Sequence, residues 1–374
     1  MIKTALIGAG GFGWCHLDSL NKLDNVELCA VCDVNPDFRK EFEKQGISFY
    51  QDYADMLENE SGLDYITVST PIHTHVAIAE RCLRSGIGVF LEKPPAILPQ
   101  ELESIICARD AGHVFCSVNY TMLADPAFIE LCEMVRQQKI GEIKNIEGIG
   151  MYRRYNSYYQ SSPWIGKMKY KESLLRDGTI NNVQSHILNN MMVLLDILGD
   201  ADIEELRAEL YHAHSIEGDD TSCFRFRTAG GKRVTFYGSL CNRIPRSAKI
   251  RITGDREIIW EYPGKLYIDG KEESFEVEEN PTVLMHKNMV EFLQSKAPLI
   301  CPPERCKKTI QLADSIYQKY TAIHSIPQEF ITGYCEEEEG IAIIDLERWT
   351  EAARKEGKLY SETECPWGGY GGTR

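Results

Sequence analysis

Short apolar runs alternate with amphipathic stretches through the first 120 residues. Their nearly continuous apolarity suits strands that are buried on both faces, as in a parallel sheet covered by helices. The pattern predicts an N-terminal α/β domain of the Rossmann type, with a doubly wound parallel sheet, over residues 1–122. The apolar runs are residues 3–7, 26–32, 64–69, 87–91 and 114–118.

The pattern changes after residue 125. A helix is predicted over residues 127–138 and a strand over 143–152, and a polar, aromatic loop then leads into a long helix. Consecutive strands separated by turn residues are typical of a largely antiparallel, open sheet, so we predict an α+β domain over residues 123–330. The five further strands of this domain are predicted at residues 206–214, 222–228, 233–239, 248–253 and 257–262.

Two more helices are predicted at residues 283–295 and 303–323, within the second domain. Residues 331–374 then form a C-terminal extension, which carries an acidic run at residues 336–339.

Composition and charge narrow the class of protein. The chain has 374 residues, 43% apolar and 26% charged, with a net charge of −15 at pH 7. Such an acidic chain is repelled by nucleic acid and by anionic membranes, so we expect neither as a partner. No segment has about 18 consecutive apolar residues, and the first strand begins without a basic and apolar leader. We therefore expect a cytoplasmic protein.

The thirteen cysteines do not form an evident disulfide or metal pattern. Most stand singly inside apolar runs, where a thiol acts as a small hydrophobic group. Cys29 and Cys32 are three residues apart on a predicted strand, so their side chains point to opposite faces. We predict buried thiols and no metal site.

A glycine-rich motif follows the first predicted strand and opens a helical stretch. Gly8 permits a tight turn, Gly10 lets the backbone approach a pyrophosphate, and Gly13 lets the helix pack closely against the strand. Gly11 and Phe12 complete the loop, which leaves the phosphates facing a helix N-terminus. In this context the motif predicts a dinucleotide site.

Asp33 stands at the end of the second predicted strand, twenty residues after Gly13. A carboxylate at this position accepts hydrogen bonds from the adenosine ribose hydroxyls and repels a 2′-phosphate. The cofactor is therefore predicted to be NAD. The alternative is a simple glycine turn with an acidic residue at the surface.

Two further segments end predicted strands at the edge where open α/β sheets bind ligands. The first contains Thr70, Pro71 and His75, and the second contains Glu92 and Lys93, followed by two prolines. Either segment alone is more often a polar loop. Together they predict a cofactor-binding crevice that the Lys93 side chain is placed to reach.

Residues 178–195 contain no charged side chain, which is unusual for a helix that faces solvent. Asn182, His186 and either Asn189 or Asn190 are spaced by three and four residues, so they form one polar stripe. The stripe either connects a core by hydrogen bonds or lines a wet pocket.

The loop at residues 152–159 is rich in tyrosine and arginine, and Trp164 follows it. Tyr155 and Trp164 could bind a polyhydroxy substrate by stacking and hydrogen bonding. Aromatic and arginine residues are also enriched at subunit contacts, so both interpretations stay open.

The motifs together resemble one known family. The glycine loop, the Thr70–His75 segment, the Glu92-Lys93-Pro94 segment and His186 make the chain similar to the glucose-fructose oxidoreductase, inositol dehydrogenase and rhizopine catabolism family. The resemblance extends over roughly residues 1–325. Asn119-Tyr120 looks like the family's crossing into its second domain, with Tyr120 among the expected substrate residues.

The resemblance implies roles for particular residues. Lys93 is expected to contact the cofactor and a substrate oxygen, and His186 to act as acid and base. Many members of the family carry Asp four residues before this histidine, where the present chain has Asn182. Asp177 could substitute for that carboxylate. With Asn181, these positions resemble a less characterised branch.

We therefore predict an NAD-dependent dehydrogenase that transfers a hydride between nicotinamide and a secondary alcohol of a sugar, cyclitol or related polyol. An enzyme that retains NAD and uses transient oxidation for hydrolysis or elimination is one alternative. A non-catalytic NAD or sugar sensor on the same fold is another. A homodimer or homotetramer is expected through the C-terminal sheet, because a broad apolar sheet face is rarely left in water.

Overall fold

The computed structural model describes residues 1–369, and the chain divides into two compact units. Unit 1 comprises residues 1–124 and 277–310, and unit 2 comprises residues 125–276 and the chain from residue 311 onward. Residues 277–310, which we predicted in the second domain, therefore belong to the first unit. The physical reason is packing, because the Phe292 ring lies 5.1 Å from that of Phe115 and His286 hydrogen bonds to His16.

Unit 1 is built on a six-stranded sheet in the order β3-β2-β1-β4-β5-β6, and all its strands are parallel. This arrangement confirms the predicted doubly wound fold. β3 was missed because it is a three-residue edge strand. The strands are β1 (Ile2–Ile7), β2 (Val26–Cys32), β3 (Ser48–Tyr50), β4 (Tyr65–Val68), β5 (Gly88–Leu91) and β6 (Cys116–Val118).

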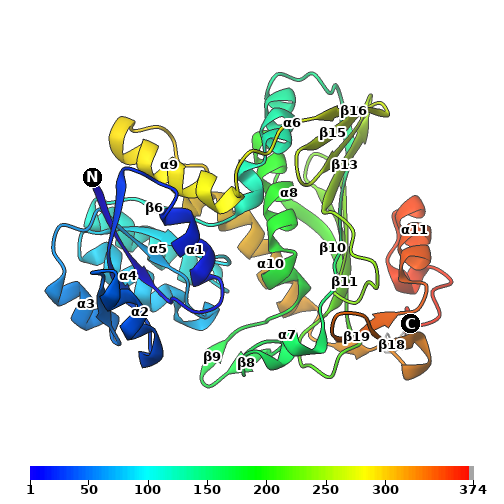
Figure 1. Ribbon diagram of the computed structural model, residues 1–374. Helices are drawn as coiled ribbons and strands as arrows, with labels where there is room; N and C mark the ends of the chain where they lie inside the picture. Colours follow the sequence, from blue (N-terminus) through cyan, green and yellow to red (C-terminus); the bar gives the residue numbers. More distant parts are fainter. Residues whose placement is uncertain (370–374) are drawn as a thin grey trace. The chain divides into compact units, whose positions relative to one another are not determined.

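Helices cover the sheet of unit 1 (Figure 1). One of them, α9, comes from residues 281–295, after the chain has already passed through most of the second unit. The helices are α1 (Gly13–Leu20), α2 (Arg39–Lys44), α3 (Tyr53–Asn59), α4 (His75–Arg84), α5 (Pro99–Gly112) and α9 (Pro281–Ser295).

Unit 2 contains a nine-stranded sheet in the order β16-β15-β14-β13-β7-β12-β11-β10-β17. Most neighbours are antiparallel, while β12 with β7 and β10 with β17 are parallel pairs. The largely antiparallel open sheet is thus confirmed. The strands are β7 (Ile143–Met151), β10 (Ile203–His212), β11 (Thr221–Thr228), β12 (Arg233–Ser239), β13 (Lys249–Gly254), β14 (Glu257–Glu261), β15 (Lys265–Ile268), β16 (Lys271–Ser274) and β17 (Ile323–Ser325).

The remaining elements of unit 2 pack on or beside this sheet. Two short hairpins were not predicted, and α10 begins at the end of unit 1 and continues into unit 2. These elements are α6 (Pro126–Arg136), α7 (Asn156–Gln160), β8 (Lys169–Tyr170), β9 (Ser173–Leu174), α8 (Ser185–Ile197), α10 (Lys307–Lys319), β18 (Ile331–Cys335), β19 (Glu339–Ile343) and α11 (Leu346–Glu356).

The two faces of the nine-stranded sheet have different partners, with α8 along one face and α11 on the other (Figure 1). Side chains alternate along β7. A Cβ at Gly148 would lie 2.3 Å from the Met191 sulfur of α8. Glu147 points the other way and pairs with Arg354 of α11 at 3.0 Å.

The C-terminal extension supplies the apolar cover on that second face. Tyr360 and Trp367 are fully buried, and both rings contact Tyr211 of β10. Toward β13 the same face carries charged side chains, including Arg251. Our expectation of self-association rested on an apolar face that the extension covers in part, and the oligomeric state stays a prediction.

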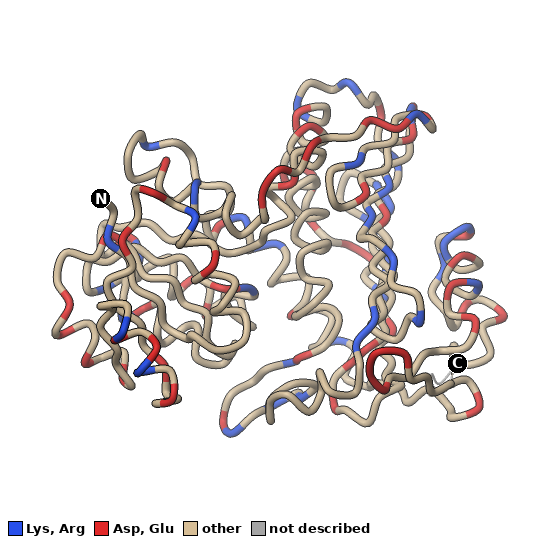
Figure 2. The backbone as a smooth tube through the Cα atoms, in the orientation of Figure 1, with Lys and Arg blue, Asp and Glu red and all other residues tan. Residues whose placement is uncertain are grey.

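Acidic and basic residues are interspersed along both units (Figure 2). Glu336, in the acidic turn between β18 and β19, is paired with Arg153 at 2.7 Å and with Arg243 at 3.3 Å. No helix within residues 1–369 has the length and apolarity needed to cross a membrane.

Candidate active-site residues

The glycine loop has the form of a phosphate cradle. Gly8 has φ +92°, and a Cβ there would lie 2.4 Å from the Ser69 carbonyl oxygen. A Cβ at Gly13 would lie 2.1 Å from the Gly8 carbonyl oxygen, so the start of α1 requires glycine. At Gly11 nothing lies within 4 Å of a built Cβ, and Phe12 is 48% exposed. The loop is closed toward the sheet and open on its outer side, as bound pyrophosphate requires.

Asp33 follows β2 and braces this loop. One carboxylate oxygen accepts hydrogen bonds from the amides of Ala9 at 2.8 Å and Gly10 at 3.2 Å, and the other accepts from the Asn35 amide at 2.8 Å. The residue is half-buried. The bracing contacts were not predicted, and the negative charge at this place fits NAD better than NADP.

The segments after β4 and β5 are tied together by His75. Its Nδ1 lies 2.9 Å from the Pro94 carbonyl oxygen and its Nε2 lies 2.8 Å from the Thr70 carbonyl oxygen. His75 is buried, and burial lowers its pKa. Pro71, which follows Thr70 in the sequence, is exposed. The predicted crevice residues are therefore neighbours, but the side chain of His75 connects two loops and does not face outward.

Glu92 is a buried carboxylate directly after β5. Its Oε1 accepts hydrogen bonds from His16 Nε2 at 3.0 Å and from Asn119 Nδ2 at 2.5 Å, and its Oε2 accepts from the Lys93 amide at 3.1 Å. Burial alone would raise the pKa of Glu92, but the hydrogen bond and charge of His16, the charge of Lys93 and the hydrogen bond from Asn119 lower it to about 2. Glu92 is thus ionised and holds the backbone of half-buried Lys93. Tyr120, next to Asn119, is almost fully buried.

In unit 2, a π-helical turn over Thr179–Val183 brings Asp177 and Asn182 together. Asp177 is buried, and its carboxylate accepts from the Gly166 amide at 2.6 Å and from Asn182 Nδ2 at 2.7 Å. The same amide nitrogen lies 3.1 Å from the Tyr158 hydroxyl. A carboxylate therefore does reach the position of Asn182, although it comes from earlier in the chain.

His186 stands four residues after Asn182, in the first turn of α8, and its side chain is half-buried. Asn189 and Asn190, one turn further on, are fully buried. Asn181 is also buried, and its Nδ2 donates to the Arg176 carbonyl oxygen at 3.3 Å. The predicted polar stripe is thus divided, with Asn182 and His186 accessible and the later asparagines in the core.

The aromatic residues of the loop at residues 152–159 also lie in different surroundings. Tyr158 joins Asn182, and its pKa is raised to about 12 by burial and by the charge of Asp177. Tyr155 instead packs 6.2 Å from the Tyr334 ring of the C-terminal hairpin. Trp164 is half-buried in the segment after α7. We expected Tyr155 at the site, whereas Tyr158 is the tyrosine that hydrogen bonds to Asn182; the sequence of this loop does not distinguish the two.

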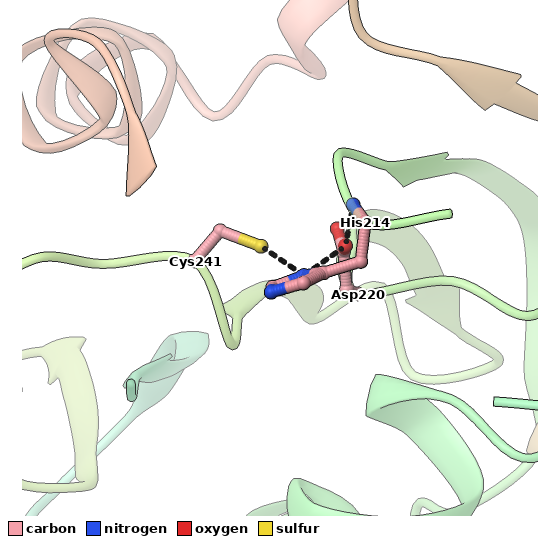
Figure 3. A group of neighbouring side chains, drawn as sticks. All are labelled: His214, Asp220 and Cys241. Atoms are coloured by element: carbon pink, nitrogen blue, oxygen red, sulfur yellow. Dashed lines mark hydrogen bonds and ion pairs between the residues drawn. The ribbon is translucent and has the colours of Figure 1, made fainter. Parts of the chain in front are cut away.

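One further group of side chains lies outside the predicted site. His214, Asp220 and Cys241 are buried, and their donor atoms lie within 4.8 Å of one another (Figure 3). His214 Nδ1 is 2.9 Å from Asp220 Oδ2, which also accepts from the amides of Ala213 and His214. Side chains of these types can bind a divalent cation, but these hydrogen bonds already explain why the Asp220 carboxylate is buried at this place. His214 and Tyr159 also line a pocket of about 850 Å³.

Comparison with known protein families matches both units of the chain. Residues 2–120 match the GFO/IDH/MocA model described as an oxidoreductase family with an NAD-binding Rossmann fold. Residues 128–260 match the GFO/IDH/MocA C-terminal domain.

Three named relatives are each 28% identical to the chain over aligned segments of 141 to 157 residues. They include D-apiose dehydrogenase of Paraburkholderia graminis (28% identity over 141 residues) and inositol 2-dehydrogenase/D-chiro-inositol 3-dehydrogenase of Lactiplantibacillus plantarum (28% over 145). Glycosyl hydrolase family 109 protein 2 of Akkermansia muciniphila is 28% identical over 157 residues. These matches cover 37%, 37% and 38% of the chain and 37%, 41% and 32% of the relatives.

Solved structures share the fold. The WlbA dehydrogenase of Bordetella pertussis, in complex with NADH and UDP-GlcNAcA, gives a TM-score of 0.72 at 22% identity, over 86% of this chain and 96% of that one. The aldose-aldose oxidoreductase of Caulobacter crescentus, complexed with glycerol, gives 0.71 at 17% identity, over 85% and 96%.

Proposed function

Because the chain belongs to the GFO/IDH/MocA family of oxidoreductases, we propose that it is an NAD-dependent dehydrogenase of a sugar, cyclitol or related polyol. The observation that carries the proposal is the anchoring of Lys93. A buried, ionised Glu92 holds the Lys93 backbone after β5, and the glycine cradle follows β1 of the same parallel sheet. The carboxyl ends of parallel strands lie at one edge, which is where such sheets bind their ligands.

The residues of unit 1 fit NAD. The cradle is open at Gly11, α1 begins at its end, and Asp33 presents a half-buried carboxylate for the ribose. When bound, NAD supplies the acceptor for a hydride from a C–H bond next to a hydroxyl.

Removing a hydride requires the hydroxyl proton to leave, so a base must lie within hydrogen-bond reach. We assign that role to His186, since an imidazole can take up a proton near neutral pH. We assign to the Lys93 ammonium the stabilisation of the negative charge that develops on the substrate oxygen. Both assignments are part of the proposal.

Asn182 would orient His186 or the substrate. Its amide nitrogen is directed at Asp177 and Tyr158, so the orientation of the side chain is set from within unit 2. Many family members carry Asp where this chain has Asn182, and Asp177 supplies the carboxylate that is missing from position 182.

The substrate class is inferred from the named activities of relatives, which act on apiose and inositol. A relative is also named as a glycosyl hydrolase, and an enzyme that retains NAD would use the same residues without net formation of NADH. A sensor would bind ligand without turnover. The measured product therefore separates the three.

The experiment is a screen of pentoses, hexoses, inositols, sugar acids and glycosides with NAD, followed by absorbance of NADH and by product analysis. Lys93→Ala and His186→Ala should each lower the rate on the best substrate by about 10²- to 10⁴-fold. Exposed residues provide matched controls in Lys22→Ala and His113→Asn, which should retain activity. Absence of NADH with every class, together with glycoside cleavage, would replace the proposal by the hydrolase; binding without any turnover would replace it by the sensor.

A further inference from the structure

A chain of polar side chains runs through the interior of unit 1. The Tyr65 hydroxyl lies 3.2 Å from His286 Nδ1, and His286 Nε2 lies 3.0 Å from His16 Nδ1. His16 Nε2 then lies 3.0 Å from Glu92 Oε1. Tyr65, His16 and His286 have no exposed surface, and Glu92 is 8% exposed. The chain links β4, α9, α1 and the end of β5.

The carboxylate end of this hydrogen-bond network fixes one direction. An ionised Glu92 only accepts, so His16 Nε2 carries a proton and donates it. The other ring nitrogens pair in turn, His16 Nδ1 with His286 Nε2 and His286 Nδ1 with the Tyr65 hydroxyl, and the tautomers of the two rings decide which atom of each pair donates. Burial lowers the pKa of His286, which keeps that ring neutral. Both nitrogens of each imidazole are therefore used.

Packing does not require this arrangement. His16 lies among the rings of Phe12, Phe90 and His286, at centroid distances of 5.5, 5.5 and 5.2 Å, and such aromatic surroundings do not by themselves call for a polar side chain. Burying a carboxylate is unfavourable unless several donors surround it. The chain supplies one of those donors, and the second carboxylate oxygen holds the amide of Lys93.

We propose that His16 and His286 are positioning residues for Lys93. His286 fixes His16, His16 orients the Glu92 carboxylate, and Glu92 fixes the backbone from which the Lys93 ammonium extends. This inference rests on the proposed role of Lys93, and it adds two histidines 270 residues apart that touch neither cofactor nor substrate.

Two substitutions at each histidine test the proposal. His16→Phe and His286→Phe keep a ring but remove the hydrogen bonds, whereas His16→Gln and His286→Gln place an amide where Nε2 stood. On the substrate identified above, the Phe variants should lower kcat about 10- to 100-fold, the effect of a small misplacement of a reacting group. The affinity for NAD, measured by calorimetry, should change less than threefold, and the Gln variants should recover most of the lost kcat.

A second measurement does not depend on activity. In the full protein labelled with ¹⁵N-histidine, the ring of His16 should appear with Nε2 protonated, and the His16→Phe variant should change the ring-nitrogen signals of His286. Identical His286 ring signals in the wild type and in the His16→Phe variant would overturn the hydrogen-bond network itself.

The link to Lys93 is tested by combining changes. If His16 acts through Lys93, His16→Phe should add less than a twofold loss of kcat in a Lys93→Ala background. Full activity of both Phe variants, or a loss that Gln does not restore, would overturn the positioning role. If Lys93→Ala itself retained activity, the proposed function would fail first, and the NMR result would still stand.

Discussion

Replacement of Glu92 by Gln should destabilise unit 1 by an amount that follows from its surroundings. The pKa of Glu92 is lowered from 4.5 to about 2, a difference of 2.5 units. At about 1.4 kcal/mol per unit, the ionised form contributes about 3 kcal/mol to the free energy of unfolding. Gln keeps the shape and one accepting oxygen for His16 and Asn119. Its amide group, however, would face the amide of Lys93, so that two donors oppose each other.

The direction of the pKa shift decides how this contribution to stability depends on pH. The folded-state pKa lies below the unfolded value, so this contribution is fully present above about pH 4.5 and is lost as the pH falls toward 2. Urea unfolding followed by fluorescence should therefore show a difference of about 3 kcal/mol between the wild type and Glu92→Gln at pH 7, narrowing at pH 3.5. Glu291→Gln, on the exposed side of α9, is the matched control and should change stability by less than about 0.5 kcal/mol. A loss below 1 kcal/mol at pH 7, or a difference independent of pH, would refute the reasoning.

Three other changes have defined outcomes. The wild type should bind NAD at least about tenfold more tightly than NADP. Asp33→Ser should lower that ratio and should also lower the affinity for NAD, because Asp33 accepts hydrogen bonds from the glycine loop. Equal affinities for the two cofactors in calorimetry of the wild type would contradict this prediction. Trp367 is fully buried, and its ring centroid lies 4.6 Å from that of Tyr360. Trp367→Ala leaves a cavity there and should lower the free energy of unfolding of unit 2 by about 3–5 kcal/mol in urea titrations. A loss under about 1 kcal/mol would show that the extension does not stabilise the sheet. Tyr158→Phe removes a hydroxyl beside Asn182 and should lower kcat more than Tyr155→Phe does, and the opposite order would return Tyr155 to the site.

The local features of the fold could be read from the sequence because each depends on near neighbours. The apolar runs predict the buried parallel strands, and Gly8 and Gly13 predict a turn that no residue with a Cβ could make. Asp33 and Lys93 were placed correctly at strand ends for the same reason, since strand, turn and helix follow one another directly.

The features that were missed depend on contacts between distant residues. No local pattern joins His286 to His16, so α9 was placed in the wrong unit. The π-helical turn near Asp177 and Asn182 is closed by the Gln184 backbone amide, which donates to the Thr179 carbonyl oxygen at 2.9 Å, while the buried Gln184 side chain donates to the distant Gly150 carbonyl oxygen at 2.7 Å. A helical spacing drawn from residue 178 onward could not reveal that turn.

The proposed chemistry is tested most directly by the oxidation rate of the best substrate in the His186→Ala variant. The assay follows NADH at saturating NAD and substrate, beside the wild type and the His113→Asn control. We predict that kcat falls about 10²- to 10⁴-fold while the affinity for NAD, measured separately, changes less than threefold, since His186 belongs to unit 2 and the NAD-binding residues belong to unit 1. Turnover within about twofold of the wild type would contradict the assignment of His186 as the base and, with it, the proposed mechanism.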